Sequence, residues 1–174
     1  MEDKLRTFLK ERFGDKILSE YSHRGQLSFY VQPQAVRDIA VALKDDADLN
    51  IEFLVDITAV DHQGRPWEKD GRFEVVYIMM SLKHTFRFML RVKVNDGESL
   101  PTLSDDWDCA NWLEREVWDL MGINFAGHPD LTKILTVDEL EGHPLRKDFG
   151  ITYELPQFSH NPNDIEIVPD NPHH

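Results

Sequence analysis

The sequence has a single cysteine, Cys109, among its 174 residues. One thiol cannot form an internal disulfide or supply the several thiolates of an iron–sulfur cluster or a cysteine-based zinc site. The longest apolar run, 75–80, is far shorter than the roughly 20 residues of a membrane-spanning helix. The residues after Met1 contain no continuous apolar stretch typical of a secretory signal. We therefore expect a cytosolic protein that meets a membrane only through its partners.

Basic residues are also scarce, since 19 Lys and Arg stand against 32 Asp and Glu and give a net charge of −13. A chain of this charge does not neutralise a phosphate backbone, which excludes a nucleic-acid binder. It gives equally little support to a basic helix on a membrane surface. The hydrophobic share of 41% is typical of a globular protein with a real core.

Hydrophobic periodicity predicts an α+β fold in which helices pack on a mainly antiparallel sheet. Helices are predicted over 4–13 and 33–43, and over a third segment that begins at Ser104 or an adjacent aspartate and ends at Gly122. Strands are predicted over 17–21, 27–31, 52–60, 73–82 and 85–94. In the 52–60 strand Phe53, Val55, Ile57 and Ala59 share one face. The 73–82 strand is apolar on both faces, so we expect it to be central and covered on both sides.

The pattern divides the chain into three parts. An α+β globular domain is expected over 1–122, followed over 123–150 by an irregular segment rich in Gly, Pro and His, with one helical turn at 137–140. The tail, 151–174, is acidic, contains no Lys or Arg, and should not fold alone. An extended segment with spaced apolar residues is suited to binding along a partner.

The third predicted helix contains the most polar groups of interest. An apolar stripe is expected through Cys109, Ala110, Leu113, Val117, Leu120 and Met121, which would make Cys109 a core thiol. Arg115 and Asp119 are expected to pair at i,i+4. Glu116 borders the stripe and is expected to be a buried anchor for an arginine or for backbone amides. Trp112 lies off the stripe, where it marks a partner surface or packs beneath the following loop.

No arrangement of residues points clearly to catalysis. Glu114 and Glu116 lie about 200° apart on a helix, so they cannot flank one bond. No nucleophile elbow or phosphate-binding glycine loop is present. His128 and His143 each sit in a Gly-His-Pro triplet, where they either cap carbonyl groups or offer imidazoles to a metal. The residues alone favour a scaffold protein, with a stand-alone metal hydrolase that uses His128, His143 and an acid as the alternative.

One stretch is more specific than the rest. It runs Asn111-Trp112-Leu113-Glu114-Arg115-Glu116-Val117-Trp118-Asp119-Leu120-Met121-Gly122, continues through Gly127-His128-Pro129-Asp130-Leu131, and is followed by Lys133 and Gly142-His143-Pro144-Leu145-Arg146-Lys147-Asp148-Phe149. In order and spacing it resembles the thirty-kilodalton subunit family of respiratory complex I. Members of this family are the C subunits of bacterial NADH-quinone oxidoreductases and the J subunits of cyanobacterial and chloroplast complexes. The resemblance covers the chain up to about residue 150.

The resemblance implies a subunit of the peripheral arm of a proton-translocating NADH:quinone oxidoreductase, on the cytoplasmic face of the cell membrane. Such a subunit binds the forty-nine-kilodalton subunit, which forms the quinone site with the small cluster-bearing subunit. It implies no catalytic residue, metal or cofactor in this chain, because FMN, iron–sulfur clusters and quinone belong to other subunits. Equivalent assembly subunits of membrane-bound hydrogenases and formate hydrogenlyases are the alternative.

The residues that the resemblance places in the family motif or at the partner interface are Trp112, Glu114, Arg115, Glu116, Asp119, Gly122, Gly127, His128, Pro129, Lys133, Gly142, His143, Pro144, Arg146, Lys147 and Asp148.

Overall fold

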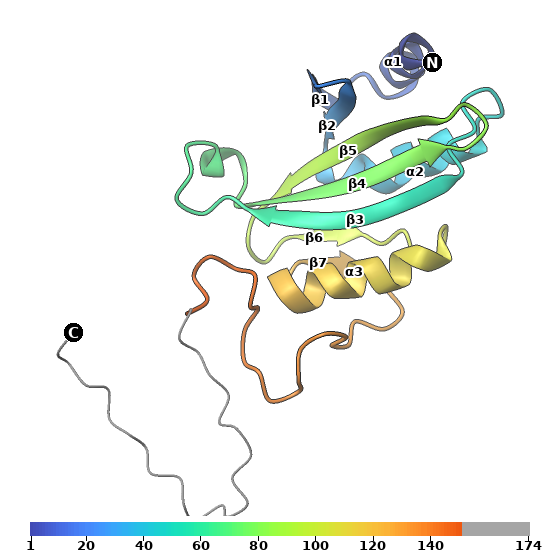
Figure 1. Ribbon diagram of the computed structural model, residues 1–174. Helices are drawn as coiled ribbons and strands as arrows, with labels where there is room; N and C mark the ends of the chain where they lie inside the picture. Colours follow the sequence, from blue (N-terminus) through green and yellow to red (C-terminus); the bar gives the residue numbers. More distant parts are fainter. Residues whose placement is uncertain (151–174) are drawn as a thin grey trace, which may run out of the picture.

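The computed structural model describes residues 1–150 (Figure 1). The predicted acidic tail, 151–174, lies outside these residues. The elements are α1 (Glu2–Phe13), β1 (Ile17–His23), β2 (Gln26–Val31), the 3₁₀ turn η1 (Pro33–Ala35), α2 (Val36–Asp45), β3 (Phe53–Asp61), the 3₁₀ turn η2 (Glu68–Asp70), β4 (Phe73–Ser81), β5 (Phe86–Val94), β6 (Ser99–Pro101), α3 (Asp108–Met121) and β7 (Asn124–Ala126).

The main sheet has five strands in the order β1-β2-β5-β4-β3. Three of its pairings are antiparallel, and β2 pairs with β5 in parallel. This confirms the predicted α+β class and the mainly antiparallel sheet. Strands β6 and β7 form a separate two-stranded parallel ribbon beside α3.

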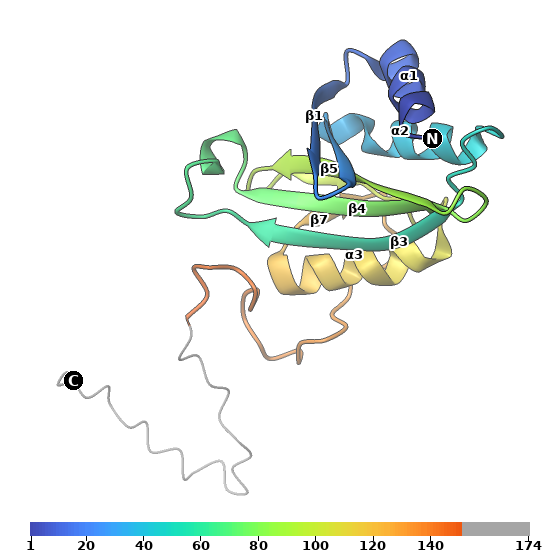
Figure 2. The same ribbon diagram turned by 45° about the horizontal axis from the view of Figure 1, so that its top comes forward.

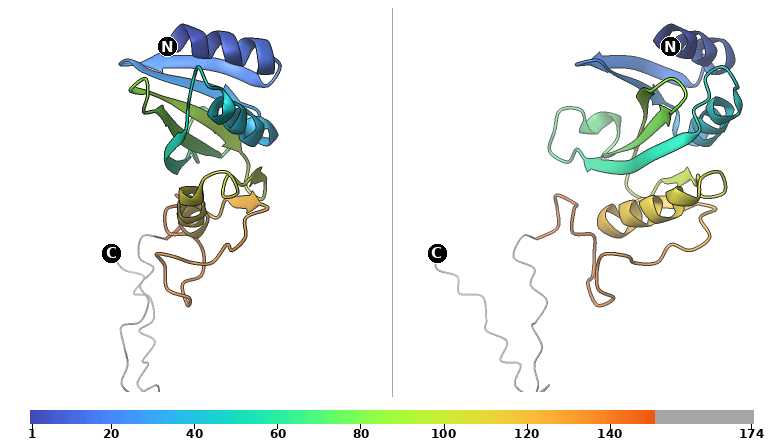
Figure 3. Two further views of the ribbon diagram at one scale, coloured as in Figure 1. Left: turned by 90° about the vertical axis from the view of Figure 1, so that its right-hand side faces the viewer. Right: turned by 45° about the vertical axis from the view of Figure 1, so that its right-hand side comes forward.

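Helices α1 and α2 lie on one face of the main sheet (Figures 1 and 3). Their apolar stripes bury Leu5 and Leu9 from α1 and Ile39 and Leu43 from α2 in one core with the sheet. Helix α3 packs along β3, the edge strand, and the segment that follows β7 runs along the far side of α3 (Figure 2). The core therefore continues past the edge of the sheet and onto α3.

Strand β3 departs from the predicted alternation. A bulge between Leu54 and Asp56 shifts its register against β4. As a result Leu54 and Ile57 are buried, whereas Phe53 and Val55 are exposed, so the prediction that Phe53 and Val55 share a face with Ile57 is wrong.

Strand β4 is central, as predicted, but only one of its faces is covered by a layer of helices. Phe73, Val75, Tyr77 and Met79 are buried in the core. Within residues 1–150 no helix lies over the opposite face (Figure 3). The prediction of a strand covered on both sides is confirmed only in part, because on this opposite face Glu74 and Val76 are buried whereas Ile78 and Met80 are half-buried.

Helix α3 begins at Asp108, later than the predicted start at Ser104 or an adjacent aspartate, and its N-terminal flanking residue Trp107 makes no side-chain cap. The Ser104 hydroxyl instead donates to Thr102 Oγ1 at 2.9 Å, since the Thr102 proton is used on Glu114, and this bond keeps Ser104 in the preceding turn. The predicted end is confirmed, since Gly122 adopts the left-handed conformation with φ 73°.

Candidate functional site

Of the predicted stripe on α3, Ala110, Val117 and Met121 are buried as expected, and Glu114 is buried beside them. Glu114 is fully buried and Glu116 is exposed, so the expectation that Glu116 is the buried anchor is wrong. Cys109 is exposed rather than a core thiol. Glu114 can occupy this core position because its carboxylate has a backbone N–H and a hydroxyl as hydrogen-bond partners. A pattern of apolar residues does not reveal such a position.

Glu114 fastens α3 to the segment between β6 and the helix. Its carboxylate accepts hydrogen bonds from the Leu103 N–H at 2.7 Å and from the Thr102 hydroxyl at 2.5 Å. Burial raises the pKa of Glu114 to about 7, and these two hydrogen bonds oppose the rise only in part. The carboxyl group is therefore a titrating group in the interior.

Arg115 and Asp119 make no pair with each other among the described residues, contrary to the prediction. The Arg115 guanidinium donates to the carbonyl oxygen of Thr132 at 3.1 Å, to its hydroxyl at 2.7 Å, and to the carbonyl of Lys133 at 3.3 Å. It also lies over the ring of Trp112, 4.9 Å from its centroid. Arg115 thus ties the segment after β7 to the helix.

Asp119 binds the next turn of the same segment. One carboxylate oxygen accepts the N–H groups of Ile134, Leu135 and Thr136 at 2.8–3.0 Å. The other accepts the Thr136 hydroxyl at 2.5 Å. Burial alone would raise the pKa of Asp119, but these four donors outweigh it and lower the pKa to about 2. Asp119 is thus the ionised centre around which 134–136 turns.

Lys133 and the two histidines also bind backbone. The Lys133 ammonium donates to the carbonyl oxygens of Val137, Asp138 and Leu140 at 2.6–3.1 Å. The chain turns at 137–140, with the Leu140 N–H bonded to the Val137 carbonyl, but the turn is not the helical one predicted. The Asp130 N–H donates to His128 Nδ1 at 3.1 Å, so the hydrogen is on Nε2, which donates to the Asn111 carbonyl at 3.1 Å.

The second Gly-His-Pro triplet caps the end of α3. The last four carbonyl oxygens of a helix lack partners within it. Here the Trp118 carbonyl accepts the Gly122 N–H at 2.8 Å and the Asp119 carbonyl accepts His143 Nδ1–H at 2.8 Å. The next two accept from the segment that follows the triplet, in which the Leu145 N–H lies 3.0 Å from the Leu120 oxygen and Arg146 Nε lies 2.6 Å from the Met121 oxygen.

Gly122 is required at this cap for two reasons. Its φ of +73° disfavours residues with a side chain, and a Cβ there would lie 2.4 Å from the His143 ring and 2.5 Å from the Arg146 guanidinium. Gly127 and Gly142 also have positive φ, at the start of the two triplets. The glycine that ends the helix therefore also leaves the space in which His143 and Arg146 cap it.

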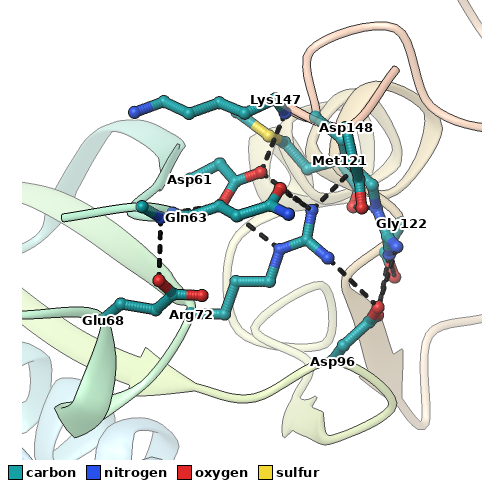
Figure 4. A network of polar contacts seen from close by, with 11 residues as sticks. Asp61, Gln63, Glu68, Arg72, Asp96, Met121, Gly122, Lys147 and Asp148 are labelled. Carbon is teal, nitrogen blue, oxygen red and sulfur yellow. Dashed lines mark hydrogen bonds and ion pairs between the residues drawn. The ribbon is translucent and has the colours of Figure 1, made fainter. Parts of the chain in front are cut away.

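A polar network fastens the last described residues to the end of the main sheet (Figure 4). Arg72 lies at its centre, 3.0 Å from the Asp61 carboxylate and 2.8 Å from that of Asp148. Asp61 also accepts the Lys147 N–H at 2.9 Å. Burial would raise the pKa of Asp61, but hydrogen bonds from Arg72 and from backbone N–H groups, that of Lys147 among them, lower the pKa to about 2. Arg146 joins the network through Asp96, at 2.9 Å.

The predicted motif residues therefore lie close together, and most of their polar atoms bind this chain's own backbone. Glu116 and Pro129 are exposed, Pro144 is half-buried, and Lys147 uses its backbone rather than its side chain. No group of three metal-ligating side chains occurs within residues 1–150. His128 and His143 are held by two different carbonyls, which confirms the capping alternative for both.

Among the side chains that the segment and α3 leave exposed, four are large and apolar, although the segment also exposes charged residues such as Asp138, Glu139 and Glu141. Leu135 is 62% exposed, Leu145 54%, Val137 51% and Trp112 of α3 59%. We call these four side chains the loop surface. Exposed apolar side chains held on a fixed backbone are typical of a protein–protein interface. Whether the motif residues contact a partner directly stays a prediction.

Comparison with known proteins identifies the family. The model of the respiratory-chain NADH dehydrogenase 30-kDa subunit matches residues 29–154. The chain belongs to this family. The NADH-quinone oxidoreductase C subunit of Roseiflexus sp. (strain RS-1) is 41% identical over 158 residues, which cover 90% of this chain and 88% of the relative. The C subunit of the Geobacter sulfurreducens enzyme is 44% identical over 144 residues, covering 82% and 86%.

Two solved structures share the fold. A trypsin-resistant fragment of Nqo5 superposes with a TM-score of 0.64 at 33% identity, covering 75% of this chain and all of the fragment. A chain of the membrane-bound sulfane sulfur reductase, an archaeal respiratory membrane complex, superposes with a TM-score of 0.70 at 25% identity, covering 93% and 96%. The family is thus one of subunits of multi-subunit respiratory complexes. Within residues 1–150 no helix has the length and apolar composition needed to span a bilayer.

The residues that bind the motif residues were not identified from the sequence. Asp61, Arg72 and Asp96 lie at strand ends and in loops, up to 86 residues from their partners. Thr102, the partner of Glu114, lies at the end of a three-residue strand. The one available signal was the Asp61–Arg72 pair of opposite charges at the facing ends of two predicted strands.

Proposed function

We propose that this chain is a structural subunit of the peripheral arm of proton-translocating NADH:quinone oxidoreductase. In this role it binds the forty-nine-kilodalton subunit and supports the quinone-reducing module, with the small cluster-bearing subunit nearby. The loop surface carries the proposal, because three large apolar side chains of the segment and Trp112 of α3 are exposed on a backbone that Asp119 and Arg146 hold in place. Family membership indicates that the complex in which this surface would bind a partner is a respiratory-chain NADH dehydrogenase.

The proposal assigns no catalytic role and no cofactor to this chain. FMN, the iron–sulfur clusters and quinone belong to other subunits, and the chain reaches the cytoplasmic face of the membrane through them. In support, most of the motif's ionisable side chains bind the chain's own backbone or, as Arg146 and Asp148 do, charged side chains of the main sheet and its loops, which is the chemistry of a scaffold. The tail over 151–174 extends the same interface along the partner.

An alternative is favoured by the likeness to the archaeal sulfane sulfur reductase complex. In that alternative the chain is the equivalent assembly subunit of a membrane-bound hydrogenase, a formate hydrogenlyase or a related complex. The two differ in the large partner that copurifies, because the large subunit of a hydrogenase has nickel–iron ligands.

The test is affinity purification of the full-length chain from native membranes, with the bound proteins identified by mass spectrometry. We expect the quinone-module subunits to copurify with the unmodified chain. The double variant Leu135→Asp, Leu145→Asp should lose them, because two buried charges oppose an apolar contact. The double variant Lys4→Asp, Thr7→Asp is the matched control, since both side chains are exposed on α1, away from the loop surface.

Two results would contradict the proposal. The first is a Leu135→Asp, Leu145→Asp variant that folds and retains its partners as fully as the Lys4→Asp, Thr7→Asp control. The second is an isolated chain that turns over NADH and quinone, or that purifies with a stoichiometric prosthetic group.

A further inference from the structure

The face of the main sheet opposite α1 and α2, here called the outward face, is bare of helices within residues 1–150 (Figures 1 and 3). An antiparallel sheet with one face in water normally alternates apolar and polar residues along each strand. Strand β4 does not, because after Glu74 its outward residues are Val76, Ile78 and Met80. The outward face has the composition of a face that another chain covers.

One end of the outward face is an apolar patch beside a cation. The register places Phe53 of β3 next to Met80 of β4, and Met80 next to Arg87 of β5. Phe53 is 47% exposed, which is unusual for a phenylalanine in a strand. Arg87 is exposed, and no ion pair engages it within residues 1–150. A partner here would meet an apolar surface and one available guanidinium.

The other end is hollowed into a groove of about 840 Å³. Its apolar lining comes from Leu18, Tyr21, Tyr30, Val60 and Trp67. Tyr21 is 51% exposed and Trp67 44%. Tyrosine and tryptophan in a concave surface are the side chains that contribute most to protein–protein binding energy.

The floor of the groove is rigid. Glu74 binds Arg91 at 2.6 Å and His62 at 3.0 Å, and it accepts the Tyr30 hydroxyl at 3.3 Å. The Trp67 indole N–H donates to His62 Nδ1 at 2.8 Å. Trp67 and Tyr30 are therefore held in place before any partner arrives, which lowers the entropy cost of binding.

The charge of the outward face decides the chemistry of its partner. The chain as a whole carries −13, yet the outward positions of β5 are Arg87, Met89, Arg91 and Lys93. The register also places Asp56 of β3 on this face, opposite Ile78. Glu74 neutralises Arg91, and Lys93 lies 3.8 Å from Asp70. Arg87 is left as the cation beside the apolar patch, so the complementary surface is apolar and carries a carboxylate at that point.

We propose that the outward face binds a neighbouring protein subunit through an apolar segment that carries carboxylates opposite Arg87. The inference rests on the proposed function, because it needs an assembled complex. It assigns a second interface, on a side of the sheet other than the β3 edge where α3 and the loop surface lie (Figure 2).

The test places a photo-crosslinking phenylalanine analogue at Phe53, at Tyr21 or, as control, at the exposed Lys4 of α1 in the full-length chain. The complex is purified from membranes, irradiated and digested, and the crosslinked peptides are sequenced. We expect Phe53 and Tyr21 to crosslink to an acidic, apolar stretch of another subunit, and Lys4 not to do so. Arg87→Glu should reduce the Phe53 crosslink about tenfold, while Arg87→Lys should largely retain it.

Three results would overturn the inference. They are the absence of a crosslink above the Lys4 level, a crosslink to residues 151–174 of the same chain, and a crosslink to a second copy of the chain. If the quinone-module subunits still copurify in any of these cases, only the second interface fails and the proposed function stands. If they do not copurify with the unmodified chain, the proposed function fails first.

Discussion

Arg146 lies across the carboxyl end of α3, with its Nε 2.6 Å from the carbonyl oxygen of Met121. The same guanidinium forms two bonds with the Asp96 carboxylate, at 2.9 and 3.0 Å. A cation is favoured at this end of a helix, where the macrodipole is negative. One side chain therefore joins the helix, the β5–β6 turn and the segment after the second Gly-His-Pro triplet.

Arg146→Ala should lower the free energy of unfolding by roughly 2–3 kcal/mol, because it removes charge-assisted bonds from a mostly buried group. Urea denaturation of the purified chain measures this. Lys147→Ala is the control, since the exposed Lys147 contributes its backbone N–H and should change stability by less than about 0.5 kcal/mol. Equal losses in the two variants would contradict the capping role of Arg146.

Gly122→Ala should destabilise the chain by at least about 2 kcal/mol. The methyl group is strained at positive φ and also displaces His143 and Arg146. Gly64→Ala is a matched control, because Gly64 has a φ of +74° and no atom near its Cβ position. That variant should lose only about 1 kcal/mol. The difference between the two midpoints in denaturant isolates the steric conflict at the cap.

Glu114 should make stability depend on pH. Its pKa is about 7 in the folded chain, above the ordinary value of 4.5, so the folded state holds the proton more tightly than the unfolded state does. Stability should therefore fall as pH rises from about 4.5 to about 7, by about 3 kcal/mol, and then level off. Glu114→Gln resembles the protonated form and should lose this dependence.

The comparison between Glu114→Gln and the unmodified chain should be made at matched pH values. Asp61 and Asp119 titrate at about pH 2 in both proteins, so their effects cancel in the difference. A difference in unfolding free energy that stays constant between pH 4.5 and 7 would show that Glu114 does not titrate there.

Asp119→Asn should release the turn at 134–136. The neutral amide keeps one acceptor oxygen, so we expect a loss of about 2 kcal/mol. Hydrogen exchange at the amides of Ile134, Leu135 and Thr136 should speed up more than exchange in the β4–β5 ladder. In the unmodified chain the stabilisation from Asp119 should be lost as pH falls below about 4 toward its folded pKa of about 2. Unchanged exchange at these three amides would contradict the assignment.

Much of the fold was predictable because it depends on local patterns. The five strands of the main sheet and the three helices follow from hydrophobic periodicity, and Gly122 ends its helix as expected. The β3 bulge was not predictable, since one inserted residue moves Phe53 to the opposite face without a signal in composition. The late start of α3 was missed because Ser104 uses its hydroxyl within the preceding turn.

The candidate site was predictable in membership and less so in roles. The resemblance selected the residues, but the buried glutamate is Glu114 and not Glu116. An apolar pattern cannot show that a backbone N–H and a hydroxyl are positioned to bind the Glu114 carboxylate. Arg115 and Asp119 have the spacing of an ion pair, yet each finds better partners in the segment after β7. Pairings across tens of residues, such as Asp61 with Lys147, depend on tertiary structure alone.

The final turn of α3 depends on residues that leave the ribosome later than the helix itself. The carbonyls of Asp119, Leu120 and Met121 receive their donors from His143, Leu145 and Arg146. During translation this end of the helix must therefore stay hydrated until about 25 further residues have been synthesised. A chain that ends ahead of His143 would therefore have a frayed helix end, with the carbonyls of Asp119, Leu120 and Met121 bonded to water.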